Sequence, residues 1–113
     1  MEIKEMVALA KVAQQEFDRK FDQKSTDNVV KALCKVIYDN AEMLAREAVD
    51  ETGMGRYEDK VAKNRNKSKG VWHNLQGKKT MGVIDIEEGT GLIKIAKPVG
   101  VVGAITPTTL SLI

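Results

Sequence analysis

The sequence predicts an α+β chain in which helices come first and strands come last. Three observations support this order. Apolar residues recur every three or four positions up to about residue 75, short β-branched runs bounded by glycines follow residue 77, and no segment repeats. Helices and strands that do not alternate along the chain are typical of α+β architecture. The change of pattern near residue 77 is the one internal boundary that we expect.

Composition limits the function classes that fit. The 113 residues are 42% hydrophobic, 30% charged and only 4% aromatic, which is typical of one small globular domain with an aliphatic core. We find neither an apolar run of the roughly 20 residues that a membrane helix needs nor a secretory signal after Met1. We therefore expect a cytoplasmic protein that contacts no membrane. Its net charge of +2 is nearly balanced and does not favour nucleic acid as a partner.

Four helices are expected before the boundary. The first covers about residues 2–21. The second begins after the capping side chains of residues 25–27 and carries the apolar stripe Val30, Leu33, Cys34 and Ile37. Asp39 and Asn40 interrupt the period, which restarts at Ala41 and ends at Thr52 and Gly53. A fourth helix, over residues 56–75, has a narrow apolar stripe and a largely solvated surface.

Strands are expected after Gly77. Two runs, Thr80–Ile86 and Leu92–Lys97, flank the turn sequence Glu87–Gly91, whose glycines tolerate positive φ, so we expect a β-hairpin. The segment Val99–Thr106 is apolar at successive positions, as in a strand covered on both faces, and Pro98 marks its start. The sequence thus predicts three strands.

Three stretches of the sequence carry a family resemblance. They are "AREAVDETGMG", "EDKVAKNRNKSKGVWHNLQGKKTMGVI" and "KPVGVVGAITPTT", and their order resembles the amino-terminal part of the aldehyde dehydrogenase superfamily. Within them "ETGMG", "KTMGVI" and "ITPTT" are most similar to the CoA-acylating aldehyde dehydrogenases. The resemblance covers about residues 16–109.

The resemblance implies an α/β fold and a division of the chain. Residues 1–77 would form an amino-terminal helical region, 78–97 a hairpin of the oligomerisation type, and 98–113 the start of a Rossmann-like NAD-binding domain. We expect a homo-oligomer formed through strands 80–97. Residues after the first strand of that domain lie beside the nicotinamide cofactor in relatives, so the cofactor-binding residues carried over are Ile105, Thr106, Pro107 and Thr108. Ligands beyond the carboxyl ends of strands are typical of open α/β sheets.

The resemblance also implies a reaction. Full-length relatives convert an aldehyde, CoA and NAD to an acyl-CoA and NADH through a cysteine thioester. At the position where the family has an oxyanion-stabilising asparagine, this sequence has Leu110, which donates no hydrogen bond. Cys34, the single cysteine, lies on a helical apolar stripe and is expected to be buried and structural. We therefore assign no catalytic residue and expect a fragment or truncated product that is inactive alone.

Other candidate residues favour no further chemistry. A basic run near Tyr57 and Trp72 fits a solvated surface better than it fits nucleic acid or the phosphates of CoA. It consists of Lys60, Lys63, Arg65, Lys67, Lys69, Lys78 and Lys79. His73 lacks a partner at catalytic spacing, and the carboxylates of Glu47, Asp50 and Glu51 are expected to be solvated rather than metal-bound. Gly100 and Gly103 lack a third glycine at the spacing of a dinucleotide motif.

A second functional hypothesis stays open. The chain is then a non-catalytic helical interaction module whose exposed hairpin adds to the sheet of another chain. Because strands 80–86 and 92–97 cannot cover both faces within so short a chain, both hypotheses predict self-association.

Overall fold

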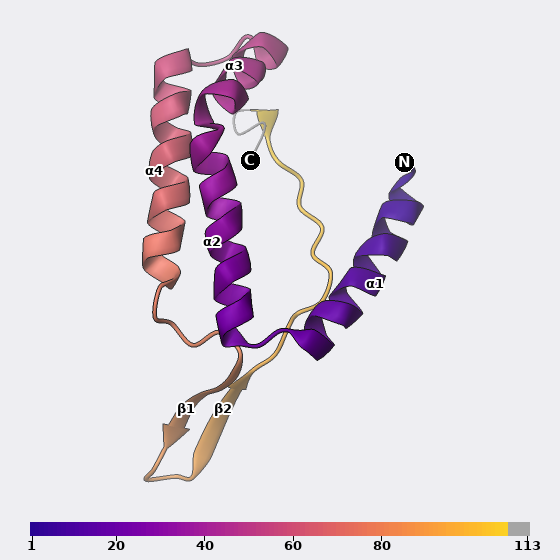
Figure 1. The fold of residues 1–113 in the computed structure, drawn as a ribbon, viewed down its shortest axis with the longest axis vertical. Coiled ribbons are helices and arrows are strands. Elements are labelled where there is room, and N and C mark those ends of the chain that lie inside the picture. Colours follow the sequence, from indigo (N-terminus) through magenta and orange to yellow (C-terminus); the bar gives the residue numbers. More distant parts are fainter. Residues whose placement is uncertain (109–113) are drawn as a thin grey trace. The chain divides into compact units, whose positions relative to one another are not determined.

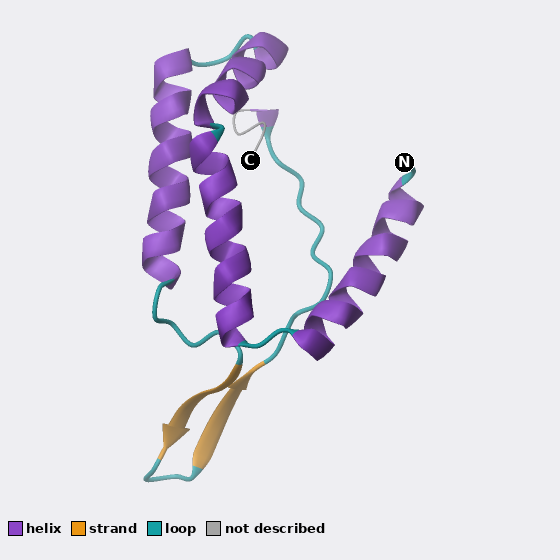
Figure 2. Ribbon diagram, viewed as in Figure 1, coloured by secondary structure: helices purple, strands orange, loops and turns teal. Residues whose placement is uncertain are grey.

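The computed structural model describes residues 1–108. It contains four helices, α1 (Ile3–Lys20), α2 (Gln23–Asp39), α3 (Ala41–Thr52) and α4 (Tyr57–Leu75), and two strands, β1 (Gly82–Glu87) and β2 (Leu92–Ala96) (Figure 1, Figure 2). The four helices and the hairpin are as predicted, with ends shifted by a few residues. The described residues form two compact units, Met1–Thr26 with Gly77–Gly103, and Asp27–Gln76 with residues 104–108. We call them the hairpin unit and the helical unit.

Helix α1 of the hairpin unit carries the predicted apolar stripe but does not bury it. None of its residues is buried, and Ile3 is 78% exposed. At its carboxyl end the rings of Phe17 and Phe21 stack with their centroids 4.4 Å apart. The periodicity therefore predicted the helix correctly, whereas the other described residues leave its apolar side largely uncovered.

The start of α2 is stabilised by a reciprocal pair of hydrogen bonds. The backbone N–H of Ser25 donates to Oδ1 of Asp22 at 2.8 Å, and the backbone N–H of Asp22 donates to Oγ of Ser25 at 2.8 Å. The amide of Asp22 lies just before the first turn of α2 and that of Ser25 lies within it, so no carbonyl of the helix can accept from either. Hydrogen bonds from the side chain and backbone of Ser25 lower the pKa of Asp22, because they favour the charged carboxylate.

The core of the helical unit lies between α3 and α4. Ala41, Ala45 and Val61 are buried together, and Tyr57 packs against them. Alanine side chains let the two helices approach closely, so little volume is needed to fill the space between them. The left-handed backbone of Gly53, with φ of 61°, ends α3 and donates its N–H to the carbonyl of Val49 at 2.8 Å.

One buried polar side chain reaches across this core. Asn64 on α4 is 3% exposed, and its Nδ2 donates to the backbone carbonyl of Ala41 at 3.3 Å. Among the described residues nothing donates a hydrogen bond to its Oδ1, which is buried. An unpaired buried acceptor costs about 1–3 kcal/mol, so the Oδ1 of Asn64 destabilises this core.

The hairpin has one apolar and one polar face. Strands β1 and β2 pair antiparallel, and the register shifts between Val83 and Asp85, which is a β-bulge at Ile84. Because the bulge reverses the alternation, four apolar side chains from both strands share one face: Val83, Ile86, Ile93 and Ile95. The opposite face carries an ion pair in which Nζ of Lys94 lies 2.7 Å from Oδ2 of Asp85. We call the first surface the isoleucine face.

The third predicted strand does not form. Residues 97–107 contain neither helix nor strand, and Val99 is 89% exposed. A strand requires a neighbour whose backbone accepts and donates the ladder hydrogen bonds, and the described residues offer none to this segment. The prediction of a strand over Val99–Thr106 is therefore wrong for this structure, although its residues favour extended backbone.

Candidate functional site

The residues predicted to contact a cofactor lie on the surface of the helical unit. Ile105 is 99% exposed, and Thr106, Pro107 and Thr108 are exposed as well. None of these four residues lines any of the cavities described below. By themselves they form no cradle for a dinucleotide, so no catalytic step is assigned to them. Leu110, where the family pattern has asparagine, lies outside the described residues.

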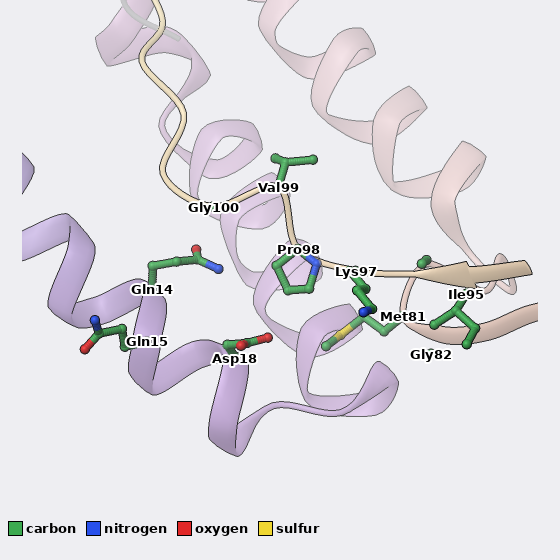
Figure 3. A pocket seen from close by; sticks show the side chains of 11 residues that line it. Gln14, Gln15, Asp18, Met81, Gly82, Ile95, Lys97, Pro98, Val99 and Gly100 are labelled. Carbon is green, nitrogen blue, oxygen red and sulfur yellow. The ribbon is translucent and has the colours of Figure 1, made fainter.

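The hairpin unit contains a groove of about 650 Å³ beside the end of β2 (Figure 3). One wall is helix α1, which contributes Gln14, Gln15 and Asp18. The other wall is the chain around the strand ends, with Met81, Gly82 and the segment from Ile95 to Gly100. In Figure 3 the amide of Gln14 points toward Pro98 and Gly100, whereas Gln15 points away from them.

The lining of the groove offers little for catalysis. Its polar groups are two amides, the carboxylate of Asp18 and the ammonium of Lys97, and it contains neither a cysteine nor a histidine. From the sequence we did not single out Gln14, Gln15 and Asp18, because we considered the apolar stripe of α1 and these three residues lie outside that stripe.

In the same unit, a side chain from the first turn of α2 binds the residues that lead into β1. Oε1 of Gln23 accepts hydrogen bonds from the backbone N–H of Thr80 at 2.7 Å and of Met81 at 3.0 Å. Nε2 of Gln23 donates to Oγ1 of Thr80 at 2.9 Å. One side chain thus fixes the two residues that precede Gly82, the first residue of the hairpin.

Cys34 differs from its prediction. It is half-buried rather than buried, since it lies on α2 beside two cavities of the helical unit. The apolar stripe on which the prediction rested is only partly covered, and Leu33 is exposed. His73 on α4 is exposed, in agreement with its expected surface position. Residues 1–108 contain no cluster of three acidic, histidine or cysteine side chains that could hold a metal ion.

The basic residues of α4 do not form one free patch. Nη2 of Arg65 lies 2.7 Å from Oε1 of Glu42, in an ion pair with α3. Lys60 is buried. The pKa of Lys63 is lowered, first by the partial burial of Lys63 itself and then by the nearby charge of Lys60. The guanidinium of Arg46 covers the ring of Tyr57 at 3.9 Å from the centroid. Of the predicted basic run, Arg65 is therefore paired and Lys60 buried, whereas Lys67 and Lys69 are exposed.

The known proteins of similar sequence that we compare with this chain are all aldehyde dehydrogenases. The chain is 53% identical over 107 residues to an acetylating succinate-semialdehyde dehydrogenase of Clostridium kluyveri, covering 95% of this chain and 23% of that protein. It is 44% identical over 106 residues to an acylating sulfoacetaldehyde dehydrogenase of Cupriavidus necator, covering 92% of this chain and 21% of the relative. A bifunctional aldehyde-alcohol dehydrogenase of Escherichia coli is 37% identical over 108 residues, which are 96% of this chain and 12% of that protein.

Solved structures agree with these relatives. An acetylating aldehyde dehydrogenase of Geobacillus thermoglucosidasius matches with a TM-score of 0.71 and 32% identity, over 76% of this chain and 19% of that one. A probable aldehyde dehydrogenase of Listeria monocytogenes matches with a TM-score of 0.76 and 32% identity, over 81% of this chain and 20% of that one. The fold class is thus that of an α+β segment of the aldehyde dehydrogenases.

The relatives indicate which aldehyde dehydrogenases the chain resembles. The chain resembles the acylating aldehyde dehydrogenases over nearly its whole length, as the sequence motifs indicate. It spans about a fifth of the length of the first curated relatives that it matches. No family model matches the chain. No described helix is long and apolar enough to cross a membrane.

Proposed function

We propose that this chain forms part of a CoA-acylating aldehyde dehydrogenase, which converts an aldehyde, CoA and NAD to an acyl-CoA and NADH. The observation that supports this most strongly is the 53% identity over 95% of the chain with the acetylating enzyme of Clostridium kluyveri. A cytoplasmic location, with or without association with a bacterial microcompartment, is part of the proposal.

The second part of the proposal concerns the hairpin. Residues 80–97 join copies of the protein into a homo-oligomer through the isoleucine face and the free strand edges. The support is physical: Ile86, Ile93 and Ile95 are each more than half exposed on a two-stranded sheet. Exposed apolar faces and unpaired edges associate readily in water.

The third part concerns the cofactor. In the complete enzyme Ile105, Thr106, Pro107 and Thr108 lie beside the nicotinamide cofactor. Their support is the resemblance of "ITPTT", together with the exposure that leaves all four free to contact other parts of a longer protein. The 113 residues alone have one cysteine, Cys34, on a helix away from these positions in sequence. We therefore expect them to be inactive by themselves.

A chimera tests the enzyme proposal. This chain replaces the matching 107 residues of the Clostridium kluyveri enzyme, and NADH formation from aldehyde, CoA and NAD is measured. We expect an active chimera, because half of the exchanged residues are identical. A chimera that folds and assembles like the parent enzyme but forms no acyl-CoA contradicts the proposal. A second assay uses the 113 residues alone. NADH formation there that survives Cys34→Ser, with contaminating enzyme excluded, contradicts their expected inactivity.

The free edges of β1 and β2 also favour a second candidate, a non-catalytic module that adds its hairpin to the sheet of a partner. Self-association occurs in both cases and does not separate them. The chimera does, because a module without an enzymatic role has no reason to support acyl-CoA formation in that scaffold.

A further inference from the structure

A cavity of about 390 Å³ lies between α2 and α4 in the helical unit. Its size falls within the range of small-molecule sites. Eight residues line it, and none of them is acidic. Its charged and aromatic lining consists of Lys31, Lys35 and Tyr38 from α2, and Lys69, Trp72 and His73 from α4.

The charge of this cavity favours an anion. Three ammonium groups and one imidazole line it. Of these groups only Lys35 has an acidic partner in an ion pair within residues 1–108, namely Asp39 one turn further along α2. Nζ of Lys31 lies 5.9 Å from the centroid of the Trp72 ring, so this ammonium is held at the wall of the cavity. A phosphate group there replaces water around exposed lysine side chains and accepts charge-assisted hydrogen bonds from them.

The aromatic walls favour a flat ring as the other part of the ligand. Tyr38 and Trp72 come from different helices, and the guanidinium of Arg65 lies 6.0 Å from the centroid of the Tyr38 ring. Aromatic faces bind nucleobases by stacking, and neighbouring cations add to this binding. The hydroxyl of Ser68 is occupied by a hydrogen bond of 2.7 Å to the carbonyl of Asn64, so the cations supply the polar recognition.

We propose that this cavity binds a nucleoside monophosphate, with the base against Trp72 and the phosphate between Lys31 and Lys69. The proposal goes beyond the enzyme function and does not depend on it. No bond forms or breaks, so the site is one of binding alone. It is separate in sequence from residues 105–108, to which the cofactor was assigned.

The chain carries two reporters at this site. Trp72 is the single tryptophan and Cys34 the single cysteine, and both line the cavity. The intact chain is titrated with AMP, with adenosine and with inorganic phosphate, while Trp72 fluorescence and the rate of Cys34 labelling by a thiol reagent are measured. We expect AMP to change the fluorescence saturably and to slow labelling severalfold, and the other two probes to bind at least about tenfold more weakly, because each makes only half of the contacts.

Variants locate the binding. Lys31→Gln and Lys69→Gln should each weaken AMP binding about two- to fivefold, as expected for solvent-exposed ion pairs. Lys11→Gln, on α1 and outside the cavity, is the matched control and should leave binding unchanged. Circular dichroism confirms that each variant keeps its helices. The proposal is overturned if AMP gives no saturable response, or if adenosine binds as tightly as AMP. If inorganic phosphate slows Cys34 labelling as much as AMP does, the site binds an adventitious ion only, and the proposal is overturned too.

Discussion

Gln23 and Thr80 form a reciprocal pair, in which Oε1 of Gln23 accepts from the backbone N–H of Thr80 and Nε2 of Gln23 donates to Oγ1 of Thr80. The pair joins residues 57 positions apart in the hairpin unit. We expect Gln23→Ala to free the amides of Thr80 and Met81, each bond contributing about 0.5–1.5 kcal/mol. Hydrogen exchange at these two amides should become faster.

Two variants control this prediction. Gln23→Glu keeps the acceptor, so protection of Thr80 and Met81 should persist. Lys24→Ala, at the neighbouring exposed position of α2, should leave exchange at both amides unchanged. Unaltered exchange in Gln23→Ala means that the side chain does not hold the start of the hairpin.

Asp22 should make the start of α2 sensitive to acid. Its pKa is lowered in the folded chain by the hydrogen bonds from Ser25, so its contribution to stability is fully present above the ordinary value of 3.8. That contribution is lost as pH falls through the lower folded value. Asp22→Ala should fray the first turn at neutral pH, seen by hydrogen exchange, and the difference from the parent should vanish in strong acid. A difference that grows on acidification contradicts this assignment.

Ile95→Lys should dissociate the proposed oligomer. A charge placed on the isoleucine face loses its hydration when that face is covered, which costs several kcal/mol. The variant should sediment as a smaller species than the parent while its helical circular dichroism stays the same.

Leu92→Lys is the matched control for the hairpin. Leu92 is as exposed as Ile95, 53% against 56%, but lies with Lys94 on the opposite face. It should leave the oligomer intact. A parent chain that is a well-folded monomer at high concentration, or a Leu92→Lys variant that dissociates equally, rules out the isoleucine face as the interface.

Asn64 gives a test of the helical core. Asn64→Asp places a buried carboxylate near the carbonyl of Ala41, at a position where no described group donates to Oδ1 of Asn64. It should lower the free energy of unfolding by roughly 2 kcal/mol or more. Burial raises the pKa of such a carboxyl, so the loss should shrink as pH falls and the group becomes protonated. Urea unfolding at two pH values measures this. Asn64→Leu, which removes the unpaired oxygen, should cost less than Asn64→Asp at neutral pH.

The sequence by itself determined the local elements. Three- and four-residue periodicity predicted α1 to α4, Asn40 and Gly53 were correctly expected to bound α3, and the glycine-rich turn predicted the hairpin. These features depend on neighbours within a few residues, which the sequence displays directly. The motifs also indicated a resemblance to the acylating aldehyde dehydrogenases, and the relatives agree with this.

Tertiary structure decided which of these surfaces are covered and which residues meet. The bulge at Ile84 places Ile86 with Val83 on one face, and strict alternation would have separated them. Gln23 meets Thr80, and Cys34 shares a cavity with Trp72, through contacts between residues far apart in sequence. The segment 99–106 favours extended backbone but lacks a neighbouring strand. Pairing and burial are properties of two segments together, so periodicity within one segment cannot predict them.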